Sequence, residues 1–393
     1  MRDCLFYPRA IGEIIRVLGG SGLWSGVPAV ARTPVLVDRD FFGINVAGSP
    51  DEAVNEASLA YLDQLGLKQV RIDLSRSGLG RYPEHFIRQL LRADYRVFVR
   101  LVQPVDEAAR MEGEDAQLAW RDFLPRVQEA LPLASFEAVE IGAVPNRRTW
   151  SGYSHRGYLN AWTIAADVLG KTGVALAGPN VSDFEPLHTI GLLKGMQRTG
   201  RVPDIQTNNL FVERTRIPEA FDHRVMGGRM ADRLKLNLIK KAGIFKALSD
   251  RYDIPRTMCT HTCWNGLRLL RWTPDIEPLR AEYLRRYLLL AIASGALDRV
   301  YWGPMIGTPD GLIDDGTGVV QPIERVAFYE RCFGKAEDFR VLPAFEAYRV
   351  LIAELSGAEL ISADVRPEAC AFTFKKADGS SLDYQWINEA VLP

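Results

Sequence analysis

The stretch FFGINVAGSPDEAVNEASLAYLDQLGLKQVRIDL, residues 41–74, decides the fold. Its first and last six residues are short apolar runs of the kind that form buried β-strands. Between them, residues 51–67 begin with acidic side chains and place Leu59, Leu62 and Leu65 on one side of a predicted helix. A strand, a helix and a second strand in this order are typical of a parallel β-sheet.

The same alternation continues through most of the chain. Six further strand-like runs follow: RVFVRL (96–101), AVEIGA (138–143), VALAG (174–178), PDIQTN (203–208), RTMCTH (256–261) and RVYWGP (299–304). The clearest helical patterns lie at residues 229–252, 277–297 and 345–355. Eight such units predict an α/β fold, a (β/α)8 TIM barrel whose site lies at the carboxyl ends of the strands. A doubly wound open sheet is the alternative, but no G-x-G-x-x-G or Walker-type loop follows any strand.

Three regions are expected along the chain. Residues 1–34, rich in Gly and Pro, form an N-terminal extension for which the sequence gives no structure, and residues 35–356 form the barrel. In residues 357–393 the pattern changes to β-rich runs on both sides of the turn ADGSS. This region predicts a short C-terminal β appendage packed on the barrel.

Composition excludes several function classes. Hydrophobic residues make up 47% of the 393 residues, enough for a large core. Lys and Arg total 48 against 49 for Asp and Glu, without long runs of one sign, so a nucleic-acid partner is not expected. No run approaches the roughly 18 apolar residues of a membrane helix, so no membrane span is expected.

Cysteine usage and the N-terminus favour a cytoplasmic location. The five cysteines are odd in number and widely scattered, which argues for a reducing compartment. The N-terminal apolar stretch contains Glu13 and Arg16, which the apolar segment of a secretory signal would exclude.

The segment VEIGAVPNRRTWSGYSHRGYLNAWTIA (139–165) resembles the fourth-strand signature of the clan A glycoside hydrolases, the group that includes the β-xylosidase and α-L-iduronidase branch. In that group the strand ends Glu-(Ile/Val)-(Trp/Gly)-Asn-Glu-Pro-Asn. Other strands agree in the same order: FFGINV resembles the first strand, QVRIDLS the second, RTMCTHTCWNG the seventh, and RVYWGPM with DGLIDD the eighth. The resemblance covers about residues 41–388 and implies a retaining-glycosidase barrel and a glycan ligand.

The chain departs from this group at both catalytic positions. The resemblance implies a general acid/base at Val144, a sugar-binding Asn at Ala143, and a nucleophilic Glu at His261. Retaining hydrolysis requires two carboxyl groups about 5 to 5.5 Å apart, which these side chains cannot supply. We therefore expect a catalytically degenerate barrel, a pseudo-glycosidase.

The stretch MCTHTCWNG (258–266) places Cys259, His261 and Cys263 on one face of a strand. Residues i and i+4 of a strand lie about 13 Å apart, whereas two thiolates on one zinc ion must come within roughly 4 Å. No metal site and no cofactor are therefore expected. His261 keeps three interpretations: a catalytic base or nucleophile, a sugar-binding group, or a packed barrel histidine.

Several other residues are candidate ligand-binding groups by the same resemblance. Arg71 matches a second-strand arginine that supports the nucleophile, and its expected partner here is Asp73 or an anionic ligand such as a uronate or phosphate. Glu140 resembles an inward-facing glutamate for which a structural role is expected. Trp264 and Trp302 match aromatic positions that suit either a sugar cleft or core packing.

Loop residues complete the candidate set. Asn146 and Trp150 follow the fourth strand, and Asn209 follows the sixth. If hydrolysis survives, displaced carboxylates must come from loops, for which Glu213, Asp183 and Glu185 are the candidates.

The function expected from these features is a pseudo-glycosidase that retains a carbohydrate-binding cleft for an oligosaccharide or polysaccharide, in cell-envelope polysaccharide metabolism. One alternative is an active glycosidase or transglycosylase that uses relocated carboxylates such as Glu213. The other is a scaffold whose barrel mouth binds an unknown protein partner or is filled by residues 1–34.

Overall fold

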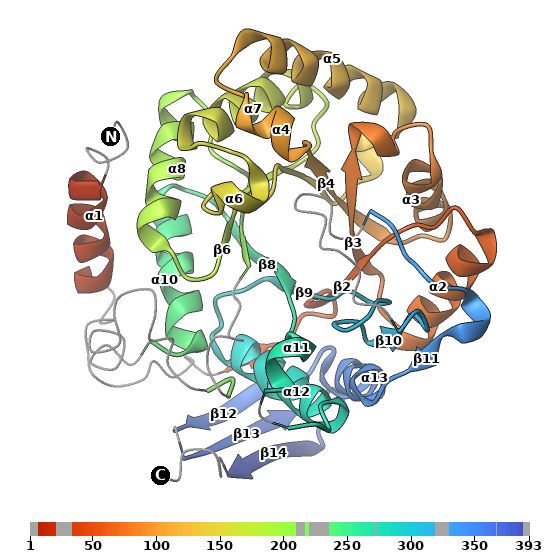
Figure 1. The fold of residues 1–393 in the computed structure, drawn as a ribbon. Helices are drawn as coiled ribbons and strands as arrows, with labels where there is room; N and C mark the ends of the chain where they lie inside the picture. Colours follow the sequence, from red (N-terminus) through yellow and green to blue (C-terminus); the bar gives the residue numbers. More distant parts are fainter. Residues whose placement is uncertain are drawn as a thin grey trace.

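A closed barrel of eight parallel strands forms the centre of the molecule (Figure 1). The structure, a computed structural model, describes residues 7–20, 34–209, 217–219, 236–271, 273–318, 330–366 and 368–387. The barrel strands are β2 (Phe42–Val46), β3 (Gln69–Ser75), β4 (Arg96–Val102), β5 (Ala138–Ile141), β6 (Leu176–Ser182), β7 (Ile205–Asn209), β8 (Arg256–Thr262) and β9 (Arg299–Trp302). They pair in chain order, and β9 pairs with β2 to close the ring. The predicted (β/α)8 barrel is confirmed.

Helices surround the barrel as an outer ring (Figure 1). The longer ones are α2 (Glu52–Leu65), α3 (Tyr82–Arg92), α5 (Glu114–Ala130), α7 (His155–Leu169), α8 (Pro186–Arg198), α10 (Leu238–Arg251), α12 (Glu277–Ala293) and α13 (Pro343–Leu355). Shorter helices at the mouth are α4 (Val105–Ala109), α6 (Arg148–Ser151) and α11 (Gly266–Leu269), and the 3₁₀ turns are η2 (Arg76–Gly78), η3 (Leu133–Ser135) and η4 (Ala336–Asp338).

The stretch 41–74 forms the first strand–helix–strand unit for local reasons. The side chain of Asp51 accepts a hydrogen bond from the backbone N–H of Ala53 and thereby caps α2. The helix ends at Gly66, whose φ of 69° lies in the left-handed region that glycine adopts readily. Leu62 and Leu65 are buried against the barrel, as the periodicity predicted. The parallel pairing of β2 with β3 follows from this crossover.

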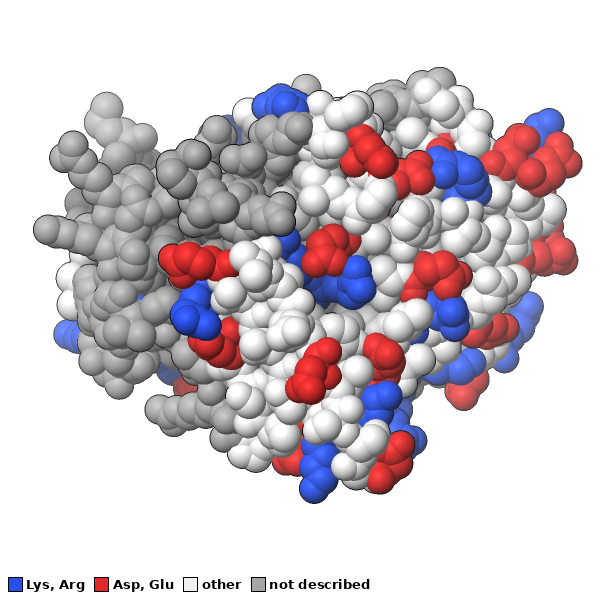
Figure 2. All heavy atoms as spheres, turned by 90° about the horizontal axis from the view of Figure 1, so that it is seen from below, with Lys and Arg blue, Asp and Glu red and all other residues white. Residues whose placement is uncertain are grey.

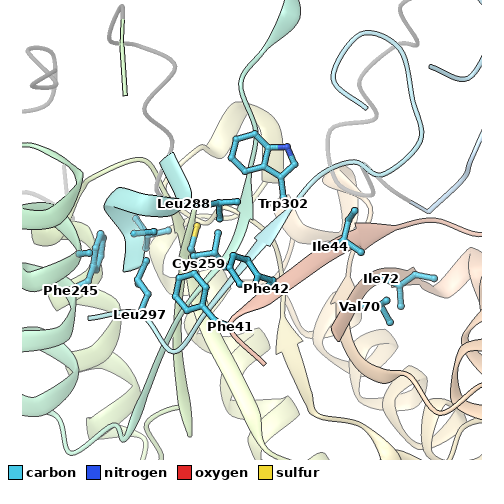
Figure 3. Packing of buried hydrophobic residues seen from close by; sticks show 14 of the residues in the cluster. Phe41, Phe42, Ile44, Val70, Ile72, Phe245, Cys259, Leu288, Leu297 and Trp302 are labelled. Atoms are coloured by element: carbon cyan, nitrogen blue, oxygen red, sulfur yellow. The ribbon is translucent and has the colours of Figure 1, made fainter. Parts of the chain in front are cut away.

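The core of the described residues has two main apolar parts and a small third one that contains Val102 and Ala143. The larger lies between the strands and the helices and includes Phe41, Phe42, Ile44, Leu288 and Trp302 (Figure 3). The smaller fills the barrel interior with one side chain from each of six strands: Phe98, Ala138, Ala177, Ile205, Met258 and Tyr301. Because side chains alternate along a strand, the next inward positions toward the carboxyl ends form a separate layer above this one.

The amino-terminal end of the barrel is closed by ion pairs. Arg299 lies 3.3 Å from Glu137 and donates a 2.6 Å hydrogen bond to the carbonyl of Asp40. Arg256 and Arg96 pair with Glu137 and Asp40, respectively. These groups line a hollow of ≈ 550 Å³, and the balanced charges indicate a structural role at this end, as is usual for this fold.

The predicted C-terminal β appendage is present as a four-stranded antiparallel sheet, and residues 35–36, which were expected in the barrel region, form its fourth strand. Its strands follow the order β1 (Val35–Leu36), β12 (Glu359–Val365), β13 (Ala369–Lys375) and β14 (Ser381–Ile387). A separate two-stranded sheet joins β10 (Ile313–Asp314) with β11 (Arg340–Val341). The four-stranded sheet lies at the periphery of the molecule beside α12 (Figure 1).

A buried carboxylate fixes this appendage to the barrel. Glu219 accepts hydrogen bonds from Arg286 on α12, at 2.7 Å from Nε, and from the indole of Trp386 on β14, at 3.1 Å. The Arg286 guanidinium also lies over the Trp386 ring, 5.5 Å from its centroid. The predicted packing of the appendage on the barrel is therefore held by a charge-assisted contact.

The N-terminal extension contains helix α1 (Tyr7–Gly20), which packs against α8 and α10 on the outer wall of the barrel (Figure 1). Its Glu13 is buried, pairs with Lys194 of α8, and accepts hydrogen bonds from Arg251 Nε at 2.9 Å and Tyr252 Oη at 2.8 Å. The described part of the extension thus lies outside the ring of helices. It does not fill the mouth.

Charge is distributed evenly over the surface in view. Lys and Arg side chains are interspersed with Asp and Glu side chains (Figure 2), in agreement with the formal net charge of −1. Across the described ranges, no helix is both long and apolar enough to cross a membrane.

We predict that Glu13 controls the docking of α1. Burial alone would raise the pKa of Glu13, but its bonds to Lys194, Tyr252 and Arg251 outweigh this effect and lower the pKa below 4.5. The contact is therefore complete at neutral pH and is lost only as pH falls below 4.5 through the lowered pKa. Glu13→Gln should accelerate amide hydrogen exchange in α1 by about tenfold at pH 7, measured by mass spectrometry.

The exposed Glu56 of α2 provides the control, because Glu56→Gln should leave exchange in α1 unchanged. Unchanged exchange in the Glu13 variant would mean that apolar packing alone holds the helix.

Candidate functional site

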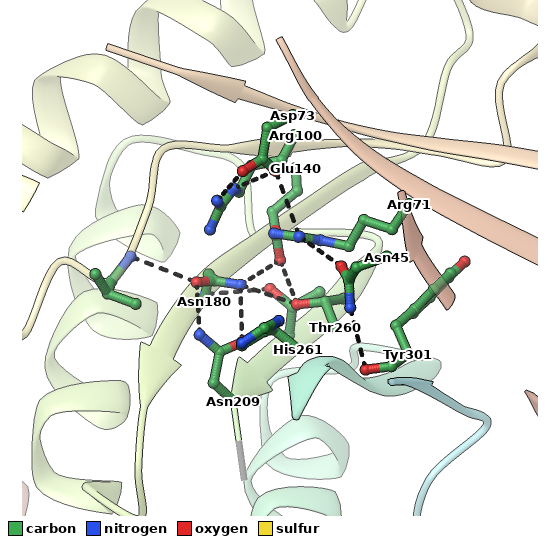
Figure 4. A network of polar contacts seen from close by, with 12 residues as sticks. Asn45, Arg71, Asp73, Arg100, Glu140, Asn180, Asn209, Thr260, His261 and Tyr301 are labelled. Carbon is green, nitrogen blue, oxygen red and sulfur yellow. Dashed lines mark hydrogen bonds and ion pairs between the residues drawn. The ribbon is translucent and has the colours of Figure 1, made fainter. Parts of the chain in front are cut away.

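A layer of polar side chains lies above the apolar interior, at the carboxyl ends of the barrel strands (Figure 4). It contains the predicted candidates Arg71, Asp73, Glu140, Asn209 and His261. It also contains residues that were not predicted: Asn45, Arg100, Asn180 and Thr260. The described strands therefore bring most of the predicted polar residues together at one end of the barrel.

Glu140 is the centre of this layer. Its side chain is fully buried, and its Oε2 accepts a 2.7 Å bond from Arg71. Its Oε1 accepts bonds of 2.8 Å from both Asn180 Nδ2 and Thr260 Oγ1. Burial alone would raise the pKa of Glu140, but Arg71 and Arg100 outweigh it and hold the pKa below its usual range. Glu140 is therefore an ionised, fully bonded carboxylate, in agreement with the predicted structural role.

Arg71 and Arg100 are held by the carboxylates around them. Arg71 contacts Glu140, donates a 2.9 Å bond to the side-chain oxygen of Asn45, and lies 3.4 Å from Asp73. Arg100 binds the same Asp73 through Nε at 2.9 Å and through Nη2. The predicted pair of Arg71 with Asp73 is present, although Glu140 is the nearer partner. The positive charges of the two arginines balance the negative charges of Asp73 and Glu140 in a layer that is almost completely buried.

Val144 lies three residues beyond the end of β5 and has a φ of 30°. A β-branched residue in the left-handed region is strained, at a cost of about 1–3 kcal/mol. Its backbone N–H donates a 3.4 Å bond to Asn180, and its carbonyl accepts a 2.9 Å bond from the N–H of Arg147. The backbone is thus held in this conformation at the barrel mouth, while the side chain offers no acid or base.

His261 lies near the end of β8, beside Thr260 and Asn209 (Figure 4). The β8–β9 register shifts between Cys259 and Thr262, so the simple alternation of sides expected for MCTHTCWNG does not hold here. Burial, and then the charges of Arg71 and Arg100, lower the pKa of His261 well below its usual value. At neutral pH the imidazole is uncharged, and the residue keeps some exposure at the mouth.

The connection after β6 is tied to the connection after β5. Asn146 donates a 2.8 Å bond to the carbonyl of Ser182 and accepts a 2.9 Å bond from the Ser182 N–H. Arg147 pairs with both Asp183 and Glu185. Burial alone would lower the pKa of Arg147. The two carboxylates have the larger effect, so the pKa of Arg147 is raised above its usual value. Asp183 and Glu185 therefore act as partners of an arginine in this structure.

The three tryptophans lie in different surroundings. Trp302 is buried with its ring 5.6 Å from that of Tyr287, and Trp264 is buried 4.6 Å from Tyr283. Both pack on α12, as the core interpretation predicted. Trp150 on α6 is 45% exposed at the mouth rim. Trp150 is thus the accessible aromatic among the three candidates.

The two cysteines of MCTHTCWNG are buried and face different surroundings. Cys259 Sγ lies 3.6 Å from Tyr287 Oη in the apolar layer outside the strands. Cys263 is also buried and unoxidised. Within the part of the chain that the structure describes, no group of three His, Cys, Asp or Glu side chains is placed to hold a metal ion.

A hollow of ≈ 800 Å³ lies at the mouth between the connections that follow β3 and β4. Its lining is rich in charged side chains, among them Arg76, Glu107, Arg110 and Glu112. Helix α4, which contributes Glu107 and lies at its side, packs on α6 and hence on the helix of Trp150. The exposed tryptophan and the polar hollow are therefore neighbouring features of the same rim.

One predicted residue is not described by the structure, and four residues of the polar layer were not predicted. Glu213 lies outside the described residues. Asn45, Arg100, Asn180 and Thr260 each interrupt an apolar strand with a polar side chain. A search for polar residues at inward positions near the carboxyl end of each predicted strand would have found them.

Comparison with known proteins supports the architecture. No protein-family model matches the chain, and no curated protein is similar to it in sequence. Among solved structures, a family 39 glycoside hydrolase from Bacteroides cellulosilyticus WH2 has 17% identity and a TM-score of 0.66, over 90% of this chain and 71% of that one. A GH30 endoxylanase from Clostridium papyrosolvens C71 has 10% identity and a TM-score of 0.54, over 91% and 83%. N2152 from Neocallimastix frontalis has 13% identity and a TM-score of 0.53, over 86% and 78%.

The chain has the fold of the clan A glycoside hydrolase barrels. At these identities the likeness concerns the fold alone.

We predict that Glu140 stabilises the barrel. Glu140→Ala would leave Arg71 buried beside an empty position and should lower the free energy of unfolding by about 3–5 kcal/mol. Glu140→Gln should cost less, because its amide oxygen still accepts hydrogen bonds. Urea unfolding followed by circular dichroism measures both. The exposed Glu129 on α5 is the control, and Glu129→Ala should change stability by no more than about 0.5 kcal/mol.

A Glu140→Ala protein as stable as the parent would show that the two arginines do not depend on this carboxylate.

Proposed function

We propose that this protein binds a neutral or weakly charged glycan at the carboxyl-terminal mouth of the barrel without hydrolysing it. The observation that carries the proposal is the state of Glu140, the carboxylate at the centre of the mouth layer. It is ionised, fully buried and saturated with bonds from Arg71, Asn180 and Thr260. It therefore has neither a proton to donate nor a free lone pair directed at a substrate.

Three other described carboxylates of the layer and of its adjoining connections are also engaged. Asp73 is bound by Arg100 and lies beside Arg71, and Asp183 and Glu185 are held by Arg147. A retaining mechanism requires one protonated carboxyl and one free carboxylate at a fixed separation. Val144 and His261 occupy the positions that the clan A resemblance assigns to this pair, and neither supplies a carboxyl group.

Features that suit binding remain at the rim. Trp150 presents an exposed aromatic face, on which the CH groups of a sugar ring can stack. The hollow on the same rim is lined by charged side chains together with Gly113, Ala116 and Ala119, and has the volume of a small-ligand site. The neutral His261 can donate or accept a hydrogen bond at the floor. The shared fold with a glycoside hydrolase and an endoxylanase favours a glycan over other ligands.

The two arginines of the layer argue against an acidic sugar. Arg71 and Arg100 already bind Glu140 and Asp73, so recruiting either one to a uronate would break a buried ion pair. We therefore expect neutral oligosaccharides to bind more tightly than their uronate counterparts.

Removal of the exposed tryptophan should weaken binding. In titration calorimetry against a panel of neutral oligosaccharides, Trp150→Ala should reduce affinity by about 3- to 10-fold, the value of an aromatic stacking contact. Val350 on α13 is an exposed apolar residue away from the mouth connections, so Val350→Ala is the control and should bind like the parent. Absence of binding across the panel would refute the proposal.

Restoring two carboxyl groups should restore hydrolysis. The double substitution Val144→Glu with His261→Glu should cleave an activated aryl glycoside, since it supplies an acid/base in the connection after β5 and a nucleophile on β8. Each single variant lacks one half of the pair and should remain at least about 10²-fold slower. Release of the aryl group is followed by absorbance.

Hydrolysis by the unmodified protein would instead support an active enzyme with relocated carboxylates. Glu213→Gln and Asp310→Asn would then identify them. Asp310 follows β9, and burial raises its pKa above the usual range, as an acid requires.

A further inference from the structure

Among the described residues, strand β14 (Ser381–Ile387) is an edge strand of the C-terminal sheet and has no strand paired on its second side. It pairs with β13 on one side over seven consecutive residues without a bulge. The opposite edge of the same sheet offers little backbone for pairing, because its strand β1 consists of only Val35–Leu36. The strand lies at the outside of the molecule (Figure 1), and Ile387 at its end is 77% exposed.

The residues of β14 lack the devices that protect a sheet edge. Proteins usually place Lys, Pro or a bulge on a long exposed edge to prevent pairing with another strand. The sequence SLDYQWI contains no Lys, Arg, Pro or Gly, and Asp383 is its single charge. Tyr, Trp and Ile favour strand pairing. An unprotected, regular edge of seven residues is therefore a surface suited to another β-strand.

The alternation of backbone groups along β14 shows which N–H and C=O groups are available to a partner strand. In the hairpin between β13 and β14, the N–H of Lys376 donates a 2.8 Å bond to the carbonyl of Ser380. The N–H and C=O of alternate residues point to alternate sides of an antiparallel strand. Counting from Ser380, the residues that direct both groups away from β13 are Ser381, Asp383, Gln385 and Ile387.

The same four residues allow a second copy of β14 to pair antiparallel across a two-fold axis at Tyr384. Asp383 then lies opposite Gln385 of the second copy, and Ser381 lies opposite Ile387. Both are pairs of outward-directed residues, so every free N–H and C=O of the edge finds a partner. All seven residues overlap in this register, and Asp383 does not face itself. A register centred on Asp383 would place two like charges directly opposite each other.

We infer that the chain forms a homodimer in which β14 pairs with β14 of a second copy, continuing the two four-stranded sheets into one of eight strands. The side of the molecule that carries this sheet shows interspersed charges (Figure 2), so no large area of one sign opposes the approach. One strand pair is a small interface, so the dimer is weak and depends on concentration.

The mass of the full chain in solution tests this inference. Multi-angle light scattering over a concentration series should show a mass that rises from 44.0 kDa toward twice that value. Gln385→Pro removes an outward N–H without touching the bonds to β13, and should abolish the rise. The control Gln385→Ala keeps the N–H and should leave the rise intact.

Two charge variants at the same position test the register. Gln385→Lys places a cation opposite Asp383 in both halves of the pair and should tighten the dimer by about 2- to 30-fold. Gln385→Asp places two carboxylates opposite each other and should weaken it by a similar factor. A mass of 44.0 kDa at every soluble concentration refutes the inference. So does a dimer that Gln385→Pro leaves intact, or one that Gln385→Lys weakens.

Discussion

The buried pairing of Arg71 with Glu140 is the constraint on which the mouth of this barrel depends. Charges at this depth are tolerated only when each one is bonded to an opposite charge and to further hydrogen-bonding groups. Glu140 meets this requirement through Arg71, Asn180 and Thr260, which come from three other strands. The carboxylate therefore organises β3, β5, β6 and β8 at once, and the same bonds that stabilise the barrel remove it from chemistry.

The neutral state of His261 follows from the same electrostatics. Two guanidinium groups lie near this position, and a carboxylate there would be stabilised by both. A histidine there behaves differently. Burial and the two arginines keep the imidazole neutral, so it adds no third positive charge to a layer in which two arginines already balance two carboxylates. Arg71 in turn directs its guanidinium to Glu140, Asn45 and Asp73. The neutral imidazole therefore leaves the charge balance of the layer unchanged.

Much of this fold could be predicted from periodicity alone, whereas the contacts of the site could not. The eight strands, α2 with its leucine face, and the β13–β14 turn all follow from patterns within a few residues of one another. The partners of Arg71 depend on which strands are neighbours and on side-chain depth, which a single sequence does not encode locally. Trp264 and Trp302 illustrate the same limit, because their burial depends on Tyr283 and Tyr287 of α12, which approaches only in the folded barrel.

The C-terminal sheet is linked to the barrel through Glu219. Glu219 belongs to the connection between β7 and α10, yet it is bound by Arg286 of α12 and by Trp386 of β14. In the inferred dimer, Trp386 would lie opposite Leu382 of the second copy, which restricts the motion of its indole. Pairing of the sheet edge would then also restrain Glu219, which accepts a hydrogen bond from this indole.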